Sequence, residues 1–171
     1  MPNKVYNVLF LCTGNSARSI LGEAVMNKLG NGRFKAWSAG SFPKGEVHPM
    51  ALSVLDGMGF DITGMRSKSW DEFSEPGAPK FDFIFTVCDD AAGETCPVWI
   101  GHPMTAHWGI EDPAAIKDEG QREAFMQALR YLTNRISLFL TLPLESIDAL
   151  AIKQRLAEIG KGEGASNGAN A

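Results

Sequence analysis

At residues 10–19 the chain reads Phe-Leu-Cys-Thr-Gly-Asn-Ser-Ala-Arg-Ser. An apolar run, Val5 to Leu11, ends in this stretch, and a helical pattern begins after it. The order of strand, small-residue loop and helix places a ring of backbone N–H groups before the positive end of a helix, where oxyanions bind. We therefore predict an oxyanion-binding loop made of Thr13, Gly14, Asn15, Ser16, Ala17 and Arg18.

Reactive groups stand at the two ends of this loop. Cys12, at its base, is expected to have a lowered pKa and to be a thiolate at neutral pH. Arg18 adds a planar fork that can hold two oxygens of a tetrahedral anion. Together they predict a nucleophilic thiolate directed at a phosphate-like centre. The alternative is a buried structural cysteine at a strand end, because cysteine is among the most buried residue types.

The composition is that of an ordinary globular domain. The 171 residues suffice for one core, 44% of them are hydrophobic and 21% are charged. A net charge of −4 argues against general nucleic-acid binding, and the chain shows no long apolar run or signal-peptide pattern. We expect a cytoplasmic protein with no nucleic-acid or membrane partner. Its three cysteines are then expected to be reactive or inert thiols rather than permanent bridges.

Strand and helix patterns alternate along the chain. Strands are expected at residues 5–11, 34–38, 81–87 and 105–108, and helices at 19–29, 49–58, through 125–139 and at 144–159. We predict an α/β fold, a single-domain three-layer sandwich whose four-stranded parallel sheet carries helices on both faces. The expected boundaries are 1–142 for this domain, 143–160 for an additional C-terminal helix and 161–171 for a disordered tail.

Other candidate residues follow the predicted strands. Ligands of parallel sheets bind beyond the carboxyl ends of the strands, where Cys12, Cys88 and Asp112 would converge. Asp112 could protonate a leaving oxygen, or it could be a turn aspartate before proline. Cys88 and Cys96 flank a polar segment that can bend, so their thiols could meet. The alternative is one buried and one exposed cysteine without a shared role.

No metal site is predicted. The spacing of Cys88 and Cys96 is not a zinc-ligand signature, because no second pair of cysteines or histidines lies at ligand spacing. The scattered His48, His102 and His107 are interpreted as structural or surface residues.

Four motifs in order make a specific pattern. They are Cys12-Thr-Gly-Asn-Ser-Ala-Arg18-Ser19, Trp37-Ser-Ala-Gly40, Thr86-Val-Cys88-Asp-Asp-Ala-Ala-Gly-Glu-Thr-Cys96-Pro97 and His107-Trp-Gly-Ile-Glu-Asp112-Pro113. Over about residues 4–142 the chain thereby resembles the arsenate reductases built on the low-molecular-weight protein tyrosine phosphatase fold.

The resemblance implies a mechanism. Arsenate, with phosphate or sulfate as analogues, would bind in the loop, and Cys12 would attack arsenic while Asp112 protonates the departing hydroxide. Cys88 would attack Cys12 and release arsenite, and Cys96 would pass the oxidation outward as a disulfide with Cys88. An external donor, thioredoxin or glutathione with glutaredoxin, would reset an enzyme that holds no bound cofactor. Ser19 would hydrogen-bond Cys12, and a monomer or weak homodimer is expected.

Several positions depart from the family pattern. Ala17 stands where many relatives carry a second loop cysteine, which is not part of the relay. The interval from Cys88 to Cys96 is one residue longer than expected for thioredoxin coupling, so either donor remains open. Some relatives bind potassium beside the loop. The matching positions here are Asn15, Glu23, Ser38 and Lys68, and the ammonium of Lys68 is expected to replace the cation.

Two alternatives differ in class from a reductase. A tyrosine phosphatase needs Cys12, Arg18 and Asp112 but no other cysteine. Such phosphatases usually carry aromatic residues after the Asp-Pro pair, where this chain has Ala114 and Ala115. A non-enzymatic anion sensor would bind the oxyanion without consuming donor electrons, and the complete Cys, Arg and Asp set argues against it.

Overall fold

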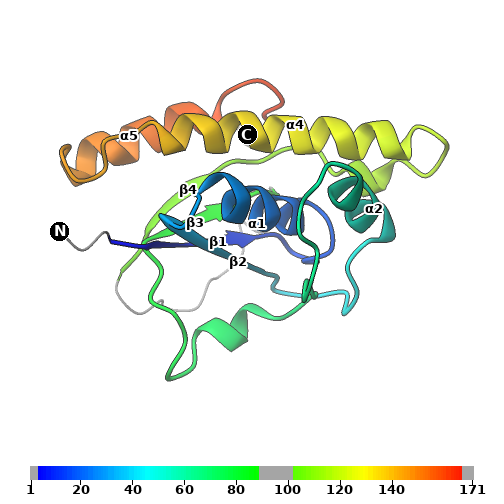
Figure 1. Cartoon of the computed structure of the whole chain (residues 1–171), viewed down its shortest axis with the longest axis horizontal. Coiled ribbons are helices and arrows are strands. Elements are labelled where there is room, and N and C mark those ends of the chain that lie inside the picture. Colours follow the sequence, from blue (N-terminus) through cyan, green and yellow to red (C-terminus); the bar gives the residue numbers. More distant parts are fainter. Residues whose placement is uncertain (1–3, 89–101, 167–171) are drawn as a thin grey trace.

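The strands and helices predicted from the sequence are present in the computed structural model, which describes residues 4–88 and 102–166 (Figure 1). In chain order the elements are β1 (Tyr6–Leu11), α1 (Arg18–Leu29), β2 (Phe34–Ala39), α2 (Pro49–Gly57), the 3₁₀ helix η1 (Trp70–Phe73), β3 (Phe83–Thr86), β4 (Met104–His107), the 3₁₀ helix η2 (Pro113–Ala115), α4 (Gln121–Leu140) and α5 (Ala149–Gly160).

The sheet has four parallel strands in the order β2-β1-β3-β4, as predicted. The chain passes from β1 to β2 on one side and later to β3 on the other side of β1. This reversal makes the carboxyl end of β1 the switch point of the topology, which is where open α/β sheets bind ligands. The residue at that end is Cys12.

Alternating side chains of β1 face two hydrophobic clusters. Tyr6, Val8 and Phe10 pack in the larger cluster, which they share with buried residues of α1, α2, α4 and α5. Leu9 and Leu11 face a smaller cluster with Phe73 of η1 and Phe81. Figure 1 shows α4 and α5 side by side along one side of the sheet. In the described ranges the opposite side is covered by η1 and the loops around it.

The C-terminal part of the chain differs from the prediction. The additional helix begins at Ala149 instead of residue 144, and Asp148 caps it by accepting a hydrogen bond from the N–H of Ala151 at 2.8 Å. It packs on its own domain, because the indole of Trp108, fully buried beside β4, donates to Leu156 O at 3.0 Å.

Residues 161–166, expected in the disordered tail, instead form a segment that we call the C-terminal strap. Ala165 pairs with Ile110 in an antiparallel bridge, and the N–H of Ser166 donates to Gly109 O at 3.1 Å. Composition predicted disorder here because glycine and alanine offer little to bury. The order comes from backbone hydrogen bonds to a distant loop. Among the described residues, no helix is both long and apolar enough to cross a membrane.

Candidate active site

The oxyanion loop, residues 12–18, connects β1 to α1. Three of its carbonyl groups, those of Thr13, Gly14 and Ser16, accept hydrogen bonds at 2.9–3.0 Å from backbone N–H groups of residues 42–48. The N–H and C=O groups of a peptide unit point in opposite directions, so turning these carbonyls outward turns the loop amides toward the inner side. The amides lie before the N-terminus of α1, as the sequence predicted.

Buried contacts behind the loop fix its shape. Gly40, at the end of β2, lies so close that a Cβ there would overlap the carbonyl oxygens of Cys12 and Thr13. Asn15 has a left-handed backbone, with φ 43°. Its fully buried amide donates to Ser19 Oγ at 2.8 Å and accepts from the N–H of Lys68 at 2.9 Å. Within the described residues Ser19 therefore bonds Asn15, and the predicted bond from Ser19 to Cys12 is not formed.

Arg18 joins the oxyanion loop to a second loop. Its Nη1 donates to Ile110 O at 2.8 Å, and its Nη2 lies 3.8 Å from Asp112 Oδ2. Its Nε is buried and has no hydrogen-bond partner within residues 4–88 and 102–166. The guanidinium edge formed by Nε and Nη2 is thus suited to hold two oxygens of a bound anion.

Asp112 belongs to this second loop, residues 109–112, which we call the acid loop. Its Oδ1 accepts from the N–H of Ala114 at 2.9 Å and caps η2, so the turn role considered from the sequence is real. Its other oxygen faces Arg18, and the side chain is 41% exposed. The carboxyl group therefore both caps a turn and stands at the oxyanion loop.

Cys12 and Cys88 are both buried and line the same cavity, and the Cys88 thiol is near enough to act on Cys12. Cys88 follows β3, and its Sγ accepts from the N–H of Thr13 at 3.2 Å. The neighbouring Cys88 thiol, followed by burial, raises the pKa of Cys12 well above its ordinary value, against the lowering effect of Arg18. The predicted low pKa was therefore wrong for this arrangement, because a neighbouring sulfur stabilises the protonated thiol.

These groups surround a cavity of about 220 Å³. It is lined by all seven residues of the oxyanion loop, by Cys88 and Asp112, and by two residues that sequence reasoning missed, Phe42 and Lys44. The latter two lie in the turn-rich segment after β2. Strand order could have flagged this segment, because β2 is parallel to β1 and its carboxyl end meets the same edge of the sheet. Cys96, the third predicted thiol, lies outside the described residues.

Comparison with known proteins identifies the protein family of this chain. The family model described as low molecular weight phosphotyrosine protein phosphatase matches residues 7–151. The chain belongs to this family.

Its arsenate reductase members are among the relatives found. An arsenate reductase of Bacillus subtilis (strain 168) is 35% identical over 141 residues, which cover 81% of this chain and 96% of that protein. A glutaredoxin arsenate reductase of Synechocystis sp. is 30% identical over 106 residues, covering 62% of this chain and 77% of that protein. A solved arsenate reductase in its phosphate-binding state matches with a TM-score of 0.61 at 28% identity, covering 78% of this chain and 98% of that one.

Lys68 lies beside Glu23 and Ser38, two of the positions that the sequence comparison matched to potassium ligands of some relatives. The ammonium of Lys68 lies 3.5 Å from Ser38 Oγ and 3.8 Å from Glu23 Oε1, and it donates to Arg66 O at 2.8 Å. Burial lowers the pKa of Lys68 and raises that of Glu23, while each partner opposes the shift of the other. Over the described ranges, no group of three or more His, Cys, Asp or Glu side chains could hold a metal ion.

Proposed function

We propose that the protein reduces arsenate to arsenite at Cys12, with a disulfide relay through Cys88 and Cys96 to an external thiol carrier. The observation that carries this proposal is the presence of two buried cysteines, Cys12 and Cys88, in the oxyanion cavity, where Cys88 Sγ accepts from the N–H of Thr13, the residue next to Cys12. A phosphatase in this family needs only one thiol beside its arginine and aspartate. A second buried thiol in the same cavity supports formation of a disulfide.

The first step joins arsenate to the enzyme. The loop amides and the free edge of Arg18 hold HAsO₄²⁻, and the Cys12 sulfur forms a bond to arsenic. One As–O bond breaks and Asp112 protonates the departing hydroxide to water. The proton that Cys12 gives up on becoming a thiolate replaces the proton lost by Asp112. Arsenic remains As(V) in this adduct. The net reaction consumes one thiol and one arsenate, and it releases one water.

The second step transfers the electrons. The Cys88 sulfur attacks Cys12, so that an S–S bond forms and the S–As bond breaks. The electron pair of the broken bond stays on arsenic, which becomes As(III), and arsenite takes up the thiol proton of Cys88. Two thiols are oxidised to one disulfide as one arsenic is reduced. Cys96 then attacks Cys88, frees Cys12 as a thiol and leaves a Cys88–Cys96 disulfide for the external dithiol to reduce.

Substrate binding also activates the nucleophile. Cys88 Sγ accepts the Thr13 N–H, which belongs to the same ring of amides that would hold the oxyanion. Arsenate in the loop competes for that N–H and moves the Cys88 thiol off Cys12. The largest cause of the raised pKa of Cys12 is then removed while Arg18 continues to lower it. The thiolate would form when substrate is bound.

The donor and the setting of the reaction belong to the same proposal. A relay ending on Cys96 suits a dithiol carrier of the thioredoxin type, while glutathione with glutaredoxin is the alternative that the name of the Synechocystis relative supports. Both donors maintain reduced thiols, which fits a cytoplasmic enzyme. We propose a monomer or a weak homodimer.

A second activity, hydrolysis of aryl phosphates, is favoured by one feature of the cavity. Phe42 lines it and is 74% exposed, so its ring can stack on a phenyl group at the mouth. Phosphate and arsenate are close in shape and charge, and Cys12, Arg18 and Asp112 would serve both reactions.

The deciding experiment measures arsenate-dependent NADPH oxidation with thioredoxin and thioredoxin reductase, and again with glutathione, glutaredoxin and glutathione reductase. We expect turnover with one system, its loss in Cys88→Ser, and a single turnover in Cys96→Ser. Arsenate-independent release of p-nitrophenol from its phosphate ester, with no NADPH oxidation in either system, would reverse the order of the two activities. Sustained turnover in Cys96→Ser would remove Cys96 from the relay.

A further inference from the structure

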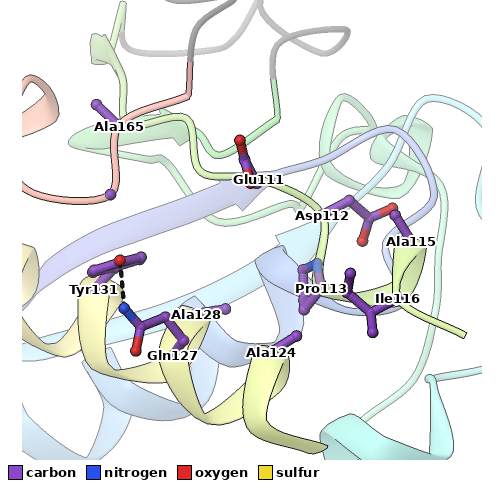
Figure 2. Close-up of a pocket in the computed structure, with 11 residues that line it drawn as sticks. Glu111, Asp112, Pro113, Ala115, Ile116, Ala124, Gln127, Ala128, Tyr131 and Ala165 are labelled. Carbon is purple, nitrogen blue, oxygen red and sulfur yellow. Dashed lines mark hydrogen bonds between the residues drawn. The ribbon is translucent and has the colours of Figure 1, made fainter. Parts of the chain in front are cut away.

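The C-terminal strap lies against the acid loop, far from it in sequence. The bridge between Ala165 and Ile110 and the bond from the Ser166 N–H to Gly109 O tie two successive residues of that loop. Figure 2 shows Ala165 and Asp112 on the rim of one cavity, with α4 forming its floor. This cavity, of about 590 Å³, adjoins the active site at Asp112.

Arg135 of α4 fastens the strap to the chain leading into the acid loop. Its Nη1 donates to Trp108 O at 3.0 Å and Gly109 O at 3.3 Å, and its Nη2 donates to Glu163 O at 3.4 Å. The side chain is only 2% exposed, and burial lowers its pKa. Across residues 4–88 and 102–166 no carboxylate forms a salt bridge with it. Burying a guanidinium that is bound only by carbonyl groups costs free energy of folding. We therefore attribute the presence of Arg135 to the positions in which it holds the strap and the acid loop.

Ile110 connects the C-terminal strap to Arg18 and Asp112 of the active site. Its backbone pairs with the strap on one side, and its carbonyl accepts from Arg18 Nη1 at 2.8 Å on the other. Asp112 follows two residues later and faces Nη2 of the same guanidinium at 3.8 Å. A shift of the strap would therefore displace the acid loop relative to the oxyanion loop.

We propose that the C-terminal strap, fastened by Arg135, positions the acid loop so that Asp112 can protonate the leaving oxygen. The inference rests on the acid role proposed for Asp112 above. Arg135 and Gly164 are positioning residues in this account, since neither lines the 220 Å³ cavity. Gly164 has a left-handed backbone, with φ +88°, and a Cβ there would overlap the ring of Tyr131. Only glycine lets the strap lie flat on α4 at this point.

Gly164→Ala tests the proposal in the full-length protein. Gly77→Ala is the matched control, because Gly77 has φ +89° and open space around it, so alanine adds the same backbone strain without moving the strap. Each change is made in the parent and in Asp112→Asn, which keeps an oxygen to cap η2. The measurement is the single-turnover rate of arsenite release from pre-reduced protein, which needs no donor.

We expect Gly164→Ala to slow this rate about tenfold in the parent and less than about twofold in Asp112→Asn, because the two changes act on one step. Gly77→Ala should leave both rates unchanged. An equal slowing in both backgrounds, or none in the parent, would overturn the proposal. If Gly164→Ala does not fold, Arg135→Lys is put through the same cycle, since one ammonium cannot span the three carbonyls.

The controls distinguish a failure of the strap proposal from a failure of the proposed arsenate reductase function or of the acid role of Asp112. If the parent releases no arsenite, the proposed function itself fails. If the parent reacts and Asp112→Asn is as fast, the acid role fails and the positioning role falls with it. If Asp112→Asn is slow and Gly164→Ala slows it further by the same factor, only the strap proposal is wrong.

Discussion

The oxyanion loop is fixed by the segment after β2 and by Lys68, whereas the acid loop is fixed by one bond from the Ile110 N–H to Val87 O and by the far end of the chain. In the first, backbone groups of residues 42–48 and the buried amide of Asn15 satisfy the loop from behind. In the second, the C-terminal strap and Arg135 hold Gly109 and Ile110, which lie far from the strap in the sequence. The two loops meet at Arg18.

This difference reflects the different structural requirements of the two loops. The oxyanion loop needs a rigid shape, because its amides must point at one centre. The acid loop needs the right distance from that centre, and distance between two loops is set by packing elsewhere. We therefore expect changes in the oxyanion loop to abolish the reaction and changes in the acid loop to slow it.

Paired substitutions give the largest expected contrast. Cys12→Ser should reduce arsenite release at least about 10⁴-fold, because a hydroxyl is far less acidic than a thiol. Asp112→Asn should reduce it about 10²-fold, since water can still supply the proton slowly. Quenched-flow measurement of arsenite from pre-reduced protein gives both rates. Equal losses in the two variants would contradict the division proposed here.

The Lys68–Glu23 pair tests how much the oxyanion loop depends on its support. Lys68→Met should lower the free energy of unfolding by about 2 kcal/mol, because it leaves the half-buried carboxylate of Glu23 without its cation. Glu23→Gln combined with Lys68→Met is the control and should regain most of that loss. Urea unfolding followed by tryptophan fluorescence measures both. A double variant as unstable as the single one would assign the loss to packing instead of charge.

The same contrast explains what the sequence could and could not predict. The strand, loop and helix around Cys12 are local in sequence, so the order of an apolar run, small residues and a helical pattern was enough to predict a loop between β1 and α1. The strap was missed because its order comes from backbone bonds to Gly109 and Ile110, which no side-chain pattern encodes. The raised pKa of Cys12 was missed because it depends on Cys88, brought in from β3.

Removing the Cys88 thiol should lower the pKa of Cys12. In Cys88→Ala, we expect the pKa of Cys12 to fall relative to the parent, because the neighbouring thiol that raises it most is lost while Arg18 remains. The pH dependence of Cys12 alkylation by iodoacetamide, with the modified residue located by mass spectrometry, measures this. Cys96→Ala serves as the control for the loss of one thiol. An unchanged profile would mean that burial alone holds Cys12 protonated.

His48 is hydrogen-bonded to the oxyanion loop and gives the smallest expected effect. Its N–H donates to Ser16 O of the oxyanion loop, and its Nδ1 caps α2 by accepting from the N–H of Met50 at 3.0 Å. Burial first, and then Lys117 and Lys44, lower its pKa below 6.5, while Asp112 of the acid loop opposes the shift; its ring packs on Phe125. The folded state thus favours the neutral imidazole, which alone can accept at Nδ1.

The sign of the pH dependence follows from this lowered pKa. Above pH 6.5 the imidazole is neutral in both states and the stabilisation is complete. As the pH falls below 6.5 the unfolded chain binds the proton first, so the free energy of unfolding declines toward the lower folded pKa. In His48→Asn the amide still caps α2 but does not titrate, so this part of the decline between pH 7.5 and 5.5 should disappear. His102→Asn, at an exposed residue with φ 50°, is the control and should keep the slope of the parent.

The same His48 variant also tests the oxyanion loop, because the backbone N–H of His48 donates to Ser16 O. A loss of stability without a matching loss of arsenite release would show that the oxyanion loop keeps its shape when its support weakens. A parallel loss of both would mean that the loop is less self-contained than its hydrogen bonds suggest.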